Sequence, residues 1–167
     1  MGQVANMGAM QQTTLLLERT YSELFDLIVE TRDYLQASQK ARLRRQPARG
    51  DFMAPSGPRQ DRGLDIERVR FMAARVDEAQ LSCETMRMTS RLTQAMAWLM
   101  VQKAVHHGEL TSAEASEERY RLGGQEVCLA ERHSEALDMP PELRRLMDRS
   151  LSVYQRIERL DRMLDAS

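Results

Sequence analysis

The sequence has few cysteines, no excess of charge of one sign and no long apolar run. It has two cysteines, Cys83 and Cys128, far apart and outside any Cys-x-x-Cys pair, so we expect reduced thiols in a cytoplasmic protein. The formal net charge is -1, so no overall field attracts nucleic acid or an anionic membrane. The longest apolar run, 95–101, is too short to cross a bilayer, and the amino-terminal residues lack the features of a signal peptide.

Patterns that indicate catalysis or a cofactor are also missing. There is no Gly-x-Gly-x-x-Gly run, and no Glu-x-x-His or His-x-x-x-His pair. His106 and His107 are adjacent, so they point about 100° apart on a helix and are better interpreted as capping its carboxyl end. Cys83 lies at helical spacing among apolar residues and has no histidine to activate it, which predicts a buried, inert thiol. We therefore expect no enzyme activity, no cofactor and no metal.

Methionine is abundant, with twelve residues, whereas aromatic residues make up 5% of the chain. A methionine-rich core is adaptable and could repack against several partners. We favour the interpretation that the methionines fill gaps inside a helical core.

Three seams of apolar residues at alternating spacings of three and four predict three long helices. The first helix is expected over 12–40, the second over 64–107 and the last from Pro140-Pro141 onward. The residues of the first seam are Leu17, Tyr21, Leu24, Ile28, Thr31 and Leu35. Those of the second helix are Val69, Met72, Val76, Ala79, Cys83 and Met86, continued by Met88, Leu92, Ala95 and Leu99. Those of the last are Leu146, Ser150, Val153, Ile157, Leu160 and Leu164.

The fold class that follows is all-α: an antiparallel three-helix bundle with a long central helix, forming one domain over 1–167. Gly108 should end the central helix, and Thr111-x-x-Glu114 reads as a capping box that opens a short helix to about Arg121. Another short helix is expected within 125–137 after Gly123-Gly124, and the 109–139 segment should cover one end of the bundle.

The segment 42–63 differs in composition, because it holds three of the five prolines and no apolar period. We expect a disordered loop. A solvated linker is favoured for it, but an acidic protein or nucleic acid could also bind there. The candidate contact residues are Arg44, Arg45, Arg49, Phe52, Met53, Arg59 and Arg62.

The central helix is expected to be about 60 Å long and the first helix about 40 Å. The excess would leave apolar turns uncovered, which predicts a two-fold homodimer through Val69, Met72 and Val76 at the amino-terminal end.

Three residues of the central helix permit either a structural or a binding interpretation. Arg87 and Arg91 lie on one face and could pair with carboxylates of the first helix, such as Glu18 or Glu23, or accept an acidic peptide. Trp98 could anchor the core or form a binding hot spot. The structural interpretation is favoured for all three.

The 82–111 stretch resembles the bacterial family named for the regulator of CtrA degradation (RcdA). The resemblance rests on Glu84, Met86, Arg87, Thr89, Arg91 and Leu92, then Ala97, Trp98 and Leu99, then Gly108, Glu109 and Thr111. It implies an all-α adaptor that helps the ClpXP protease take up protein cargo such as the response regulator CtrA. The implied location is the cytoplasm, and a position at the cell pole is a more specific alternative. The alternative is a nucleic-acid-associated regulator that uses the arginine-rich loop, although nucleic acid is the less favoured partner.

Overall fold

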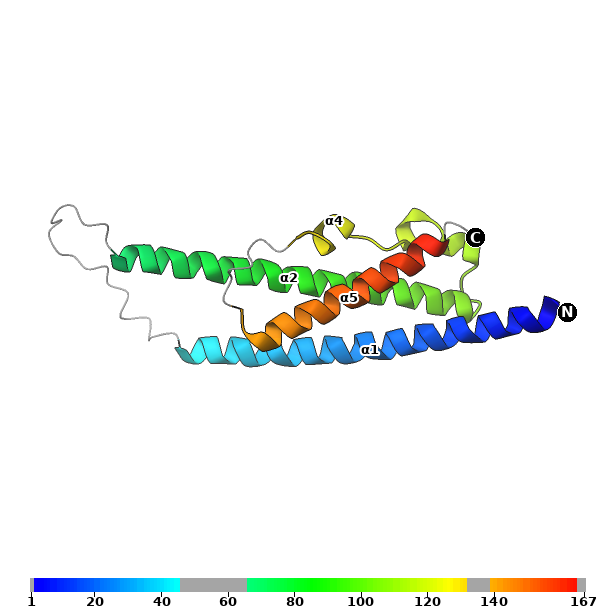
Figure 1. Cartoon of the computed structure of the whole chain (residues 1–167), viewed down its shortest axis with the longest axis horizontal. Coiled ribbons are helices and arrows are strands. Elements are labelled where there is room, and N and C mark those ends of the chain that lie inside the picture. The colour runs from blue at the N-terminus through cyan, green and yellow to red at the C-terminus, as the bar shows by residue number, and fades with distance from the viewer. Residues whose placement is uncertain (1, 46–65, 132–138, 165–167) are drawn as a thin grey trace.

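The computed structural model describes residues 2–45, 66–131 and 139–164, with side chains placed for 14–44, 76–131 and 139–164. Three long helices lie side by side in this part of the chain: α1 (Gly2–Arg45), α2 (Ile66–His106) and α5 (Pro141–Leu164) (Figure 1). Across these ranges the regular structure is helical throughout. The predicted all-α bundle is therefore confirmed.

Ion pairs and a hydrogen bond fix α1 against α2 in one antiparallel register. Thr14 contacts His106 at 3.3 Å, Glu18 pairs with Lys103 at 3.1 Å, and Arg42 pairs with Glu78 at 3.2 Å. In this register the end of α1 lies opposite roughly residue 75, so about 15 Å of α2 extends beyond it at 1.5 Å per residue.

Helix α1 is longer than the sequence predicted. It begins at Gly2 and continues to Arg45, so the first residues of the expected loop 42–63 are helical. No proline precedes Pro47, and this leaves the helix free to continue. Because α1 has 44 residues and α2 has 41, the predicted difference in their lengths is wrong, and the part of α2 that extends beyond α1 results from the stagger.

The connector between α2 and α5 returns along the bundle. Both helices run antiparallel to α1, so the chain must travel back from the end of α2 to the start of α5 (Figure 1). It does so through α3 (Ser112–Ala115), a 3₁₀ turn η1 (Glu118–Tyr120) and α4 (Gln125–Cys128). The expectation that 109–139 only covers one end is therefore wrong.

Local sequence signals set the helix boundaries near the connector. Gly108 adopts φ 74° after α2, a conformation that glycine takes without steric cost. Thr111 Oγ1 accepts from the Glu114 backbone N–H at 3.2 Å, and the Glu114 carboxylate accepts from the Thr111 N–H at 2.8 Å, which confirms the capping box. The hydrogen bonds that the Thr111 backbone N–H and hydroxyl donate to the carboxylate lower the pKa of Glu114. The helix that follows is one turn, shorter than predicted.

The core lies where α1, α2, α5 and the connector meet. Its buried members include Leu24 and Leu27 of α1, Leu92 of α2, and Val153 and Ile157 of α5. Three methionines of the core are fully or almost fully buried, whereas three others are largely exposed. The buried ones are Met88, Met139 and Met147, and the exposed ones are Met86, Met100 and Met163.

One part of the predicted seam of α2 is wrong. Val76, Ala79, Cys83 and Met86 are exposed, so Cys83 is an accessible thiol and not a buried one. The buried positions of this part of the helix are instead Glu84, Arg87, Met88 and Arg91. The seam over Met88, Leu92, Ala95 and Leu99 is confirmed.

Candidate protein-binding surfaces

Two arginines of α2 bind the connector. Arg87 pairs with Glu84 on its own helix at 2.7 Å and donates to the Glu131 carbonyl at 3.3 Å. Arg91 Nε donates to the Cys128 carbonyl at 2.6 Å. The backbone carbonyls of Cys128, at the end of α4, and of Glu131, which follows it, are thus satisfied by guanidinium groups, which costs less than leaving either partner buried alone. The suggested pairing with Glu18 or Glu23 does not occur among these contacts, because those residues pair with Lys103 and Arg156.

Trp98 joins a buried polar cluster with Arg121 of the connector and Asp161 of α5. Its Nε1 donates to Asp161 Oδ1 at 2.6 Å, and Trp98 is only 3% exposed. Arg121 binds the same carboxylate through Nε at 2.9 Å and Nη2 at 3.1 Å. The indole, the connector and α5 are therefore held together at one carboxylate, as the core-anchor interpretation expects.

The middle of the connector approaches α2 and α5 closely. Tyr154 Oη donates to the Gly123 carbonyl at 2.7 Å. A Cβ at Gly123 would lie 3.1 Å from Gln94 Oε1, and Gly124 adopts φ 75°. Burial raises the pKa of the Cys128 thiol and that of the Tyr154 hydroxyl. Together with Arg87 and Arg91, these contacts hold the connector against α2 and α5.

A ladder of ion pairs joins α1 to α5. Glu23 pairs with Arg156; seven residues later in α1 and seven residues earlier in α5, Glu30 pairs with Arg149. The next step of seven brings Ala37 to Glu142, so no third ion pair forms there. These pairs are partly exposed and contribute little stability each, roughly 0–1 kcal/mol.

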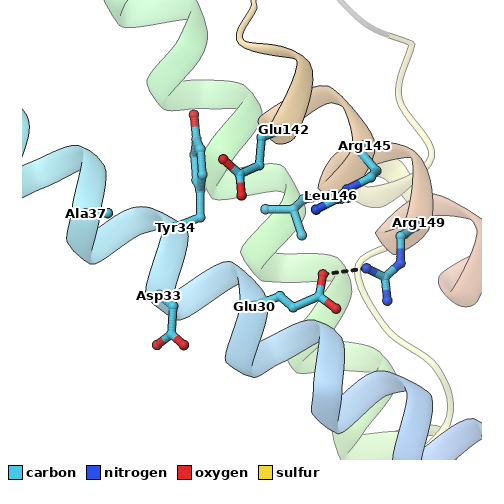
Figure 2. Close-up of a pocket in the computed structure, with 8 residues that line it drawn as sticks. All are labelled: Glu30, Asp33, Tyr34, Ala37, Glu142, Arg145, Leu146 and Arg149. Carbon is cyan, nitrogen blue, oxygen red and sulfur yellow. Dashed lines mark hydrogen bonds and ion pairs between the residues drawn. The ribbon is translucent and has the colours of Figure 1, made fainter.

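A pocket of about 460 Å³ opens where the ladder stops (Figure 2). Glu30 and Arg149 form one side, Tyr34 and Glu142 lie near each other at the other, and Asp33 points away from α5 (Figure 2). Asp33 pairs with the adjacent Arg32 at 2.8 Å. The pocket therefore offers a mixed-charge surface with an aromatic side chain, suited to a polar protein contact. The seven-residue spacing of Glu23 and Glu30, and of Arg149 and Arg156, is a signal in the sequence that could have revealed this interface.

The remaining predicted contact residues are placed only in part. Arg44 is exposed near the end of α1, and Arg45 is its last residue. Val76 is 52% exposed on α2, while the side chains of Val69 and Met72 lie outside those described. Residues outside the described ranges include Arg49, Phe52, Met53, Arg59 and Arg62. The nucleic-acid alternative depends mainly on this last group and stays a prediction.

Within the described ranges, no group of three or more His, Cys, Asp or Glu side chains is arranged to hold a metal ion. Across those same ranges, no helix combines the length and apolarity needed to cross a membrane.

The features above define a helical-bundle protein in which buried arginines and a tryptophan fix a returning connector. Residues 64–167 match the family model described as a protein of unknown function (DUF1465), and the chain belongs to this family, which is that of RcdA. The crystal structure of RcdA from Caulobacter crescentus CB15 is similar, with a TM-score of 0.56 and 25% identity. The match covers 89% of this chain and 90% of that chain. Among the curated proteins no match was found.

Proposed function

We propose that the protein is an adaptor of the RcdA kind, which promotes ClpXP-dependent degradation of cell-cycle regulators such as CtrA. The observation that carries the proposal is the likeness to RcdA over 89% of the chain, at 25% identity. The molecule acts by binding, as a single domain, and performs no chemical step of its own. Its place of action is the cytoplasm, with the cell pole as a more specific option.

The arrangement of the surface supports a binding role. Three residues of the motif, Arg87, Arg91 and Trp98, are used inside the bundle, where they hold the connector and α5. The outer faces of α1 are left for partners, and one of them forms the mixed-charge pocket beside α5. A protein with binding faces on a rigid bundle can hold cargo and protease at the same time.

A reconstituted degradation assay tests the proposal. Purified ClpXP is incubated with CtrA, with and without this protein, and CtrA loss is followed over time. We expect faster CtrA loss that rises with adaptor concentration and saturates. An unchanged rate at saturating adaptor, together with no co-purification of protease components, would contradict the proposal.

The proposal includes a two-fold dimer formed through the amino-terminal part of α2. The stagger of α1 against α2 and the exposure of Val76 support it. Sedimentation at micromolar concentration measures the mass, and Val76→Glu should shift it toward the monomer. A monomeric mass for the unmodified chain would rule out this part.

A further inference from the structure

A groove of about 620 Å³ runs along the face formed by α1 and α2. Its walls are mainly apolar: Ile28 and Leu35 come from α1, and Leu92, Met96 and Met100 come from α2. Over this part the groove follows about three helical turns of each helix, roughly 17 Å at 1.5 Å per residue. It is distinct from the polar pocket beside α5, whose lining is rich in charge.

The face around the groove carries almost no charge. No residue from Leu92 to Gln102 is ionisable, although Thr93, Ala97 and Met100 are exposed. The charged lining residue is Arg32, and it already pairs with Asp33 at 2.8 Å. Exposed helix faces of soluble proteins normally carry charged residues, so an uncharged strip of this length indicates a surface that another apolar surface covers.

One buried hydroxyl lies at the groove without a hydrogen-bond partner. Thr31 is 4% exposed, lines the groove, and its Oγ1 has no partner among the described residues. By contrast, Thr85 and Thr89 donate to backbone carbonyls one turn earlier. Buried hydroxyls are nearly always paired, so we expect the Thr31 hydroxyl, which is itself buried in this conformation, to rotate toward the groove and pair with a polar group that enters it.

The shape of the groove selects a convex occupant. Two helices that lie side by side leave a channel into which a further helix packs, as in a four-helix bundle. A second copy that docks through the same face would also build a four-helix layer, as two helical hairpins do, so the oligomeric state is an outcome of the test. A single helix of about three turns matches both the length and the width.

We propose that this groove binds one amphipathic α-helix of a partner protein, with an uncharged apolar face that carries one hydroxyl or amide side chain opposite Thr31. The inference deepens the adaptor function and rests on it, because it assigns the helix to the protein cargo. The apolar walls supply affinity, and the hydroxyl of Thr31 selects among apolar helices.

The test uses the full chain and labelled helical peptides of about 14 residues. The first peptide carries leucine at positions that share one face and serine at the centre of that face. Two matched peptides carry alanine or aspartate in place of the serine. Fluorescence anisotropy should show the serine peptide binding most tightly, with the aspartate peptide at least about tenfold weaker because its charge would be buried unpaired.

Two surface variants separate the groove from the rest of α2. Met100→Glu lies in the groove, where Met100 is 60% exposed, and should weaken the serine peptide at least about tenfold. Met86→Glu is the matched control, because Met86 is 70% exposed and lies outside the groove lining, and it should bind as the unmodified chain does. Thr31→Val keeps the shape and should abolish the preference for serine over alanine. Helical circular dichroism confirms that each variant is folded.

The outcomes also separate this inference from the adaptor function. Peptide binding that survives Met100→Glu, or no binding of any peptide, would overturn the groove assignment. A dimer that Met100→Glu converts to a monomer would overturn it as well, because the groove would then be a self-interface. If Met100→Glu still accelerates CtrA degradation by ClpXP as the unmodified chain does, the adaptor function stands and the groove assignment fails. If no form accelerates degradation, the adaptor function fails, and the peptide titration alone decides what the groove binds.

Discussion

Replacing Asp161 with alanine should lower the free energy of unfolding by about 4 kcal/mol. The carboxylate is 3% exposed and accepts from Trp98 Nε1 at 2.6 Å and from two nitrogens of Arg121. Removing one partner of a buried ion pair costs about 3–5 kcal/mol. The lower half of this range applies, because the Arg121 side chain is 20% exposed and keeps its hydrogen bond to the Asp161 backbone carbonyl. The unpaired indole N–H adds about 1–3 kcal/mol, with partial overlap between the two terms.

Urea unfolding followed by circular dichroism measures this loss, and the fluorescence of Trp98, the only tryptophan, reports on the cluster itself. Glu30→Ala is the control, since it breaks a partly exposed ion pair with Arg149 and should cost less than about 1 kcal/mol. Trp98→Phe removes a single donor and should cost about 2 kcal/mol. If Asp161→Ala is no more destabilising than Glu30→Ala, the cluster does not hold the connector as argued.

Three further outcomes are expected. Leu92→Asp and Leu24→Asp each place a charge in the core and should cost several kcal/mol, so a thermal melt within a few degrees of the unmodified chain would contradict the core assignment. In a thiol titration near pH 8 the exposed Cys83 should react at once, whereas Cys128, whose pKa is raised by burial, should react only after denaturation; rapid reaction of both would refute its burial. Gly124→Ala should cost about 1–2 kcal/mol in urea unfolding, because φ 75° is strained for alanine, and an unchanged midpoint would show that the turn relaxes.

The apolar spacing predicted much of the bundle because the pattern and the packing share one period. Leu92 and Ala95 of α2, and Val153 and Ile157 of α5, are buried as their seams predict. Helix boundaries also followed from local chemistry, since Gly108 and the capping box at Thr111 depend only on near neighbours. Short-range rules hold where the interacting groups are close in sequence.

The same method failed where buried positions are polar. Glu84, Arg87 and Arg91 are buried because connector carbonyls and an adjacent carboxylate satisfy the guanidinium groups, and no hydropathy period records such partners. An apolar seam was therefore placed one face away, on residues such as Cys83 and Met86, which are exposed. Asp161 was missed for a related reason, because its partner Trp98 lies 63 residues away.

We expect partner choice to depend on a part of this molecule that the family model does not cover. The family model covers 64–167 and therefore omits α1. The buried clamp formed by Arg87, Arg91 and Trp98 lies within the matched region and determines how the connector packs. The pocket beside α5 and the apolar groove beside α2 each have α1 as one wall. We therefore expect the partners of this chain to be selected mainly through α1, in the part of the molecule about which the family match is silent.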